Sequence, residues 1–128
     1  MTAEFTISVA HNEARLTATA AFADTGPSPS KIEFFDSAAN LLVTVVLAKP
    51  CGVVAGGVLT LSQGTVGGDL IALDGVATTA VWLNGAGAPV ASGTVTDDAG
   101  EGPFTIEGTD GTQLYAGGRA IIGVTEIT

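Results

Sequence analysis

The chain has 128 residues, enough for one domain with one hydrophobic core. Apolar residues make up 46%, aromatic residues 5% and charged residues 13%, which excludes a disordered chain and predicts a thin core of small and β-branched side chains. The net charge is −9 and the 4 basic residues are scattered, which excludes nucleic acid and an anionic membrane surface as partners. So little charge also indicates that part of the surface is buried against another protein.

Residues 1–12 are expected to form an N-terminal strand or arm. Phe5, Ile7 and Val9 alternate with hydroxyl residues, and this period of two predicts a strand with one buried face. Pairing within its own sheet is favoured, but the arm could instead add a strand to a neighbouring subunit. The same three residues are therefore candidate partner contacts. The acidic start of the chain predicts no signal peptide.

Residues 13–24 fit either a helix or a strand. Asn12 as N-cap, the many alanines and the stop at Gly26 favour a short helix. Thr17 and Thr19 favour a strand. The helix is slightly preferred.

A first hairpin is predicted from two strands joined by a five-residue turn over 36–40. The strands are Lys31–Phe35 and Leu41–Ala48. The second is apolar on both faces and is expected to be central and covered on both sides. Lys49–Gly52 is expected to interrupt it, leaving Val53–Gly57 irregular or edge-like. The eight residues Leu41–Ala48 are too few for a membrane helix, which needs about 20 apolar residues.

Later strands are shorter. They are predicted at Val58–Leu61, Leu70–Leu73, Gly75–Leu83, Ala88–Val95, Phe104–Ile106 and Arg119–Ile127. The Asn84-Gly85 turn joins two of them into a second hairpin. Trp82 is expected in the core, and if exposed it would be a partner anchor, so it is also a candidate partner contact. Ile122 and Val124 are expected to point inward.

These elements define the fold class. Roughly seven to nine short strands, with turns at a spacing of about 8–12 residues, are typical of sandwiches and small barrels. We expect one mainly β domain over residues 1–128, an antiparallel β-sandwich or jelly-roll-like barrel with one short helix near residues 13–24.

Groups for nucleophilic catalysis are scarce. His11 and Cys51 are the only histidine and the only cysteine, and neither has a catalytic motif around it. A pair between them is left open by the sequence. The expected roles are a surface loop residue for His11 and a half-buried structural thiol for Cys51. The protein is therefore expected not to be an enzyme.

Metal and cofactor sites are not predicted. One histidine and one cysteine cannot supply a structural zinc site. Asp97–Glu101, or Asp69 with Asp74, could offer oxygen ligands to calcium, but the alternating pattern of a calcium loop is missing. A solvated acidic turn is favoured. We expect no cofactor.

The order of the apolar segments resembles that of small β-rich bacteriophage virion proteins. The matching segments are Asn12–Leu16, Lys31–Phe35, Leu41–Val43, Gly57–Leu61, Val81–Trp82, Asn84–Gly85, Val90–Val95 and Val124–Thr128. The resemblance implies a capsid cement or decoration subunit, or else a head–tail or tail accessory subunit, found in the virion after synthesis in the host cytoplasm. It implies the major capsid protein or another virion protein as partner, and a homo-oligomer. A receptor- or carbohydrate-binding β-module is the alternative, with Trp82 or Tyr115 exposed beside Asp and Asn.

Overall fold

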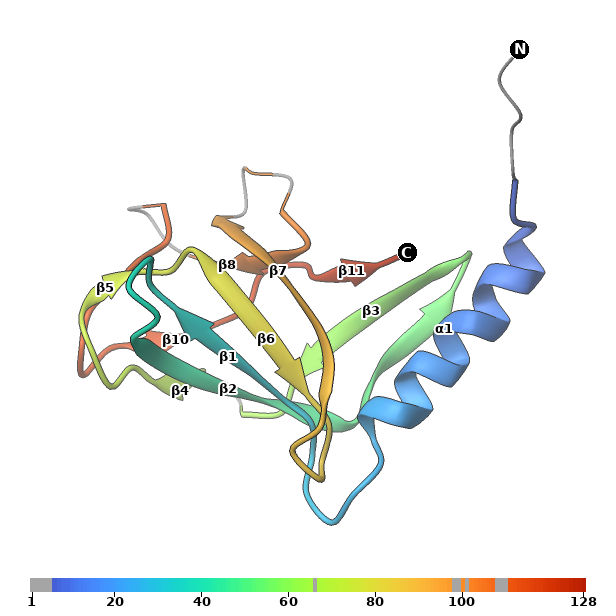
Figure 1. Cartoon of the computed structure of the whole chain (residues 1–128), viewed down its shortest axis with the longest axis horizontal. Helices are drawn as coiled ribbons and strands as arrows, with labels where there is room; N and C mark the ends of the chain where they lie inside the picture. Colours follow the sequence, from blue (N-terminus) through green and yellow to red (C-terminus); the bar gives the residue numbers. More distant parts are fainter. Residues whose placement is uncertain (1–5, 66, 98–99, 101, 108–110) are drawn as a thin grey trace.

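The computed structural model describes residues 6–65, 67–97, 100, 102–107 and 111–128. These residues form a mainly β structure with one helix and a sheet that curls into a nearly closed barrel, which confirms the predicted fold class (Figure 1). The helix is α1 (Val9–Ala23). The strands are β1 (Lys31–Phe35), β2 (Leu41–Ala55), β3 (Val58–Gln63), β4 (Asp69–Leu70), β5 (Gly75–Val76), β6 (Thr79–Leu83), β7 (Pro89–Asp97), β8 (Phe104–Ile106), β9 (Gln113–Leu114), β10 (Arg119–Ala120) and β11 (Glu126–Ile127).

The predicted helix is confirmed, but it begins earlier than its expected cap. Ser8 is the N-cap, and its side chain accepts a hydrogen bond from the His11 backbone N–H at 3.1 Å. The prediction of an N-terminal strand is therefore wrong for the residues that the structure describes, because Ile7 has no regular structure and Val9 is already helical. Asn12 lies inside the helix, where its side chain donates to the Gly57 carbonyl at 2.8 Å. Phe5 lies outside the described residues.

The barrel wall is one sheet of strand order β11-β3-β2-β1-β6-β7-β8. Both predicted hairpins, β1–β2 and β6–β7, are confirmed. Their inner side chains, among them Ile32, Phe34 and Trp82, are fully buried. On β2, Val45 and Leu47 are buried on the inner face, whereas the outer face is only half-buried.

The predicted interruption of β2 is found in its pairing with β3, which shifts register between Leu47 and Gly52, but not in the strand itself. The strand continues through Lys49–Gly52 to Ala55, because a register shift between Leu47 and Gly52 absorbs the irregular residues and pairing with β3 resumes. A Gly56-Gly57 turn with positive φ at both residues, +61° and +79°, then reverses the chain, as a tight hairpin turn requires.

Residues 119–127 close the barrel, although they are not the continuous strand that was predicted. Ile122 bridges Ile106 of β8, the Thr125 carbonyl accepts from the Leu61 N–H at 3.0 Å, and β11 pairs with β3. Ile122 points inward as expected, but Val124 is 72% exposed, because the chain changes sides between its bonds to β8 and to β3. The pair β7–β8 is parallel, in contrast to the other strand pairs described.

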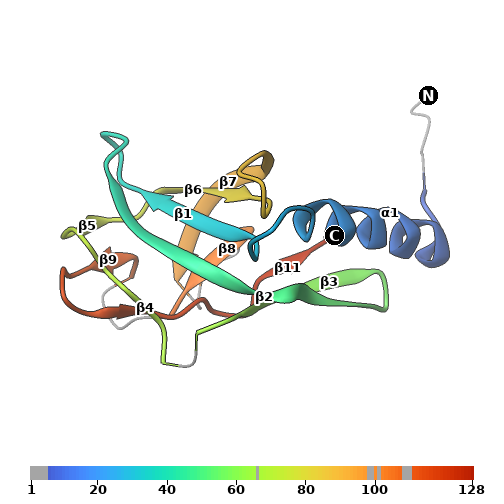
Figure 2. The ribbon, with the colours of Figure 1, turned by 90° about the horizontal axis from the view of Figure 1, so that it is seen from below.

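Helix α1 lies along the hairpin formed by β2 and β3, where the hairpin extends beyond the barrel (Figures 1 and 2). Leu16 and Ala23 of the helix are buried, together with Leu59 and Leu61 of β3. The helix thus covers one side of this hairpin. Among the described residues, no helix combines the length and the apolar character needed to cross a bilayer.

Candidate protein contact surfaces

The residues predicted to contact a partner do not form one surface. Trp82 is 0% exposed in the barrel wall, which confirms its core role and removes it as an anchor on the folded chain. Ile7 is half-buried ahead of the helix, and Val9 is exposed on the first turn of α1, beside the Gly56-Gly57 turn. Of these residues, only Val9 is both described and well exposed.

His11 and Cys51 are far apart. The Cys51 backbone N–H donates to the Asp24 carboxylate at the end of α1, at 3.0 Å, whereas His11 lies in the first turn. At ~1.5 Å rise per residue the helix separates them by about 20 Å, which rules out the catalytic pair that the sequence left open. Cys51 is fully buried, and this burial, together with the charge of Asp24, raises the pKa of its thiol to about 11. Such a thiol is a poor nucleophile.

The acidic residues considered for calcium act as structural acceptors. The Asp69 carboxylate accepts from the Gln63 side chain at 2.8 Å, and the Asp74 carboxylate accepts from the Ala116 N–H at 2.6 Å. In the described part of the chain, no group of three or more His, Cys, Asp or Glu side chains converges as a metal site would require. Residues 98, 99 and 101 of the acidic loop lie outside the described residues.

The most distinctive surface is a two-stranded ribbon at one end of the barrel, which we call the end ribbon (residues 69–77 and 112–120). Its two segments pair through β4–β10 at one end and β5–β9 at the other. Between these ladders, Ile71 exchanges backbone hydrogen bonds with Gly117 and Gly118 at 3.0 and 2.9 Å. Short, separated ladders thus form one continuous ribbon.

The inner side of the end ribbon belongs to the core. Its buried side chains are Ile71, Ala77, Leu114 and Ala120. The Leu42 carbonyl of β2 accepts from the Ala72 and Leu73 N–H groups at 2.9 and 3.3 Å. Gly75 packs so closely on the Leu42 side chain that a Cβ atom there would come within 2.8 Å of it. The ribbon is therefore fixed to the barrel along its length.

A polar cluster fixes the ribbon at its β4–β10 end. The Gln63 amide nitrogen donates to the Asp69 carboxylate and to the Ala120 carbonyl at 2.9 Å, and its oxygen accepts from the Ile122 N–H at 3.0 Å. Asp69 also accepts from the Val46 N–H at 3.3 Å. One glutamine and one carboxylate thus connect β2, β3, the end ribbon and the closing segment.

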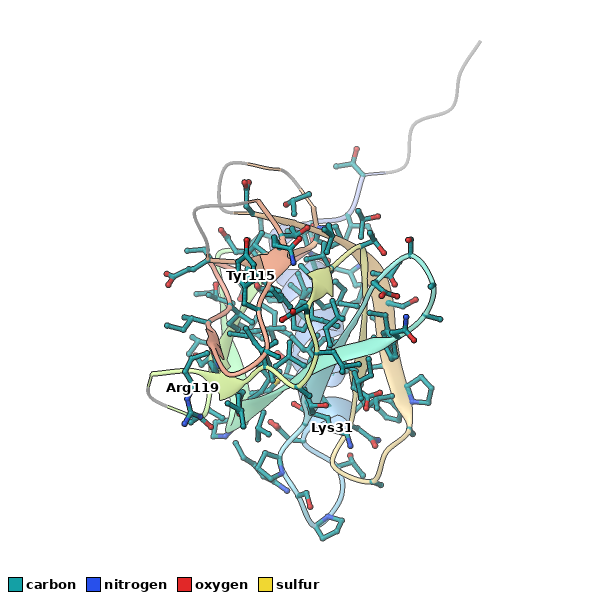
Figure 3. All side chains as sticks on the ribbon, turned by 90° about the vertical axis from the view of Figure 1, so that its left-hand side faces the viewer. Lys31, Tyr115 and Arg119 are labelled. Carbon is teal, nitrogen blue, oxygen red and sulfur yellow. The ribbon has the colours of Figure 1, made fainter. Side chains whose placement is uncertain are left out.

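The end ribbon exposes several large apolar side chains together with the charged Asp74 and Arg119. Its large exposed side chains are Leu70, Leu73, Val76 and Tyr115, the last of them 56% exposed. Arg119, also exposed, is the cross-strand neighbour of Leu70, and its guanidinium group makes no ion pair or hydrogen bond within the described residues. Figure 3 looks onto this end of the molecule and shows Tyr115 and Arg119 on it.

This combination of side chains has the composition of a protein contact surface. Tyrosine and arginine are the residues enriched at the energetic centres of interfaces, and a group of exposed apolar side chains is uncommon on a surface without a partner. Sequence analysis missed the ribbon because its partner segments lie about 45 residues apart. The available signal was the pair of large apolar residues at 70 and 73 outside any regular alternation.

Comparisons with known protein families, with curated proteins and with solved structures gave no match.

Proposed function

We propose that this protein is a non-enzymatic structural subunit of a virion, a capsid cement or decoration protein that binds the shell through the outer side of the end ribbon. The observation that carries the proposal is that one ribbon, fixed to the barrel, exposes Leu70, Leu73, Val76 and Tyr115, with Arg119 opposite Leu70. A head–tail or tail accessory subunit would use the same surface against a different virion protein.

The rigidity of this surface supports the proposal. Polar and apolar contacts hold the ribbon from its inner side, so little conformational entropy is lost when its outer side is covered. A cement subunit adds contact area to an assembled shell and stabilises it by mass action. The resemblance to small virion proteins noted above points to the same class of partner.

The proposal is tested by cosedimentation of the purified chain with shells assembled from the major capsid protein encoded in the same genome. The wild-type chain should bind, and Leu73→Asp should weaken binding about tenfold or more, because it places a charge in the apolar group. Val53→Asp is the matched control, since Val53 is an exposed apolar residue on the distant hairpin of β2 and β3. Absence of wild-type binding, or equal losses in both variants, would refute a shell contact through the end ribbon.

A carbohydrate-binding module is the second candidate, and one observation favours it. Tyr115 is exposed, and its neighbour Ala116 is bonded to the carboxylate of Asp74, so an aromatic face lies close to an acid. The buried Trp82 does not contribute. A glycan array probed with the intact chain should give a signal that Tyr115→Ala abolishes; a silent array would eliminate this candidate.

A further inference from the structure

The turn between β6 and β7 contains the chain's one asparagine that is followed by glycine, Asn84-Gly85. Such a pair can lose its side-chain amide. The glycine backbone nitrogen attacks Cγ of the asparagine, a C–N bond forms, the bond from Cγ to Nδ2 breaks, and ammonia leaves with the proton of the glycine N–H. Water then opens the five-membered imide to aspartate or isoaspartate. Glycine permits the attack because it has no side chain to hinder it.

Hydrogen bonds fix the peptide unit that would have to react. Its carbonyl, from Asn84, accepts from the Gly87 N–H at 2.9 Å, and its N–H, from Gly85, donates to the Ala23 carbonyl at the end of α1 at 3.3 Å. The Asn84 side chain is only 4% exposed, and its Oδ1 accepts from the N–H groups of Ala86 and Ala88 at 3.0 and 2.9 Å. Ring closure rotates this peptide unit and removes the proton of Gly85, so it breaks the bonds on both sides.

The loop of residues 24–30, which leads from α1 to β1, covers the same peptide unit. A Cβ atom on Gly85 would overlap the Ser28 carbonyl, and one on Gly26 would overlap the backbone nitrogen of Ala86. Two glycines thus allow the loop and the turn to touch through their backbones. Lys49 of β2 holds the loop in place, because its Nζ donates to the Gly26 carbonyl at 2.7 Å.

We propose that Asn84 is a deamidation site that the folded chain closes and that unfolding opens. In the folded chain the reaction must wait until the loop of residues 24–30 leaves the turn, so its rate is lowered by the small fraction of time spent open. In the unfolded chain no such wait exists. Isoaspartate carries an extra backbone carbon, so a chain with this product cannot restore the paired bonds from residue 84 to Gly87 and Ala88. Each period of unfolding therefore removes some chains permanently, whatever the protein's partner is.

The test compares the intact chain with and without urea at mildly alkaline pH, where the glycine nitrogen loses its proton more readily. Peptide mapping by mass spectrometry measures aspartate and isoaspartate at position 84, which should form about a hundredfold faster in urea. Asn12 and Asn40 are internal controls, because the residues that follow them carry large side chains, and both should stay largely intact. After removal of urea, the refolded fraction should fall as isoaspartate accumulates. Equal rates at Asn84 in the two conditions would overturn the proposal.

Two substitutions test whether the loop provides the protection. Gly26→Ala should speed deamidation of the folded chain about tenfold, because the added Cβ forces the loop away from the turn. Gly56→Ala is the matched control: φ is positive there too, but a Cβ would meet no described atom within 4 Å, so the rate should not change. Lys49→Met, a milder change that removes the Nζ bond to the loop, should give a smaller increase.

In urea, all these variants should react at the wild-type rate, since the loop protects only the folded chain. This arm separates protection by the fold from a change in the reactivity of the pair itself. If Gly26→Ala does not fold, Lys49→Met carries the comparison with Gly56→Ala. Folded-state rates in the loop variants that do not exceed the rate in Gly56→Ala would refute the role of the loop.

Discussion

The barrel wall and the end ribbon are both β structure, but different interactions hold them. In the wall, continuous ladders such as β1–β6 place Ile32 and Trp82 opposite each other and bury both completely. In the ribbon, each ladder is two residues long, and bonds to Leu42, Asp74 and Gln63 complete the fixation. The wall is thus stabilised mainly by apolar burial, whereas the ribbon adds to its buried Ile71 and Leu114 a set of individual polar bonds, some of them to distant parts of the chain.

Because of this difference, substitutions in the wall and substitutions on the ribbon should have different effects. The wall buries its large side chains, so substitutions in its core should mainly lower the free energy of unfolding. The ribbon buries Ile71 and Leu114 but also keeps the large side chains Leu70, Leu73 and Tyr115 outward. Substitutions on its outer side should therefore change binding with little effect on the fold.

The largest effect is expected from Trp82→Ala in the barrel wall. Removing the indole should lower the free energy of unfolding by about 3–5 kcal/mol, because the fully buried side chain leaves a cavity. Urea unfolding measures this loss. Leu70→Ala on the end ribbon is the control, and its change should stay within about 0.5 kcal/mol because the side chain is exposed. Equal losses of unfolding free energy in the two variants would show that the wall is not stabilised differently from the outer side of the ribbon.

The next effect concerns the polar fixation of the ribbon. Gln63→Leu should lower the free energy of unfolding by about 2–3 kcal/mol, because the Ile122 N–H and the Ala120 carbonyl lose a partner in a half-buried place. Hydrogen exchange should become faster at Ile122 before it changes at Phe34 of the wall. Ser62→Ala, at an exposed neighbouring position, should change neither. Uniform acceleration across the molecule would show that the ribbon and the wall open together.

A smaller effect is expected at alkaline pH. Because burial raises the pKa of Cys51 from 9.0 to about 11, the unfolded chain loses its thiol proton first. The stability linked to this group is fully present below pH 9 and should be lost as the pH rises toward 11. Urea unfolding of wild type and Cys51→Ala across this range measures the loss. The two proteins should differ in slope only above pH 9, and a difference that begins at neutral pH would contradict the assignment.

The smallest effect is expected at the exposed turn between β1 and β2. The backbone N–H and side-chain amide of Asn40 donate to Asp36 at 2.9 and 3.1 Å and lower the pKa of its carboxyl group below 3.8. Stability linked to Asp36 is thus present above pH 3.8 and is lost as the pH falls through the lowered value. Asn40→Ala should move the pKa of Asp36 back toward 3.8 in a carboxyl NMR titration. An unchanged pKa would show that the amide makes no contribution.

The barrel wall was largely predictable from the sequence. The alternation in Lys31–Phe35 and the Asn84-Gly85 turn are local signals, and both hairpins follow from them. The start of α1 was missed because Phe5, Ile7 and Val9 alternate like a strand, while the capping bond of Ser8 overrides this pattern. The continuation of β2 was missed because a bulge leaves no mark on hydrophobic alternation.

The candidate contact surfaces were less predictable. The two segments of the end ribbon come together only through pairing with β9 and β10, which are two residues long. Such short strands have no periodicity. Exposure also depends on the whole fold: Val124 and Ile122 are two residues apart in one apolar run, yet one is exposed and the other buried.

The closing segment of residues 119–127 sets an order of events during synthesis. The Gln63 side chain waits for the Ile122 amide, which is made 59 residues later, and β3 waits for β11. Until this segment has left the ribosome, strands β1 to β7 can pair while the gap between β3 and β8 stays open, with Leu61 and Ile106 at its edges. The apolar interior is therefore accessible to chaperones or to other nascent chains for as long as translation takes to reach the final turn of the barrel.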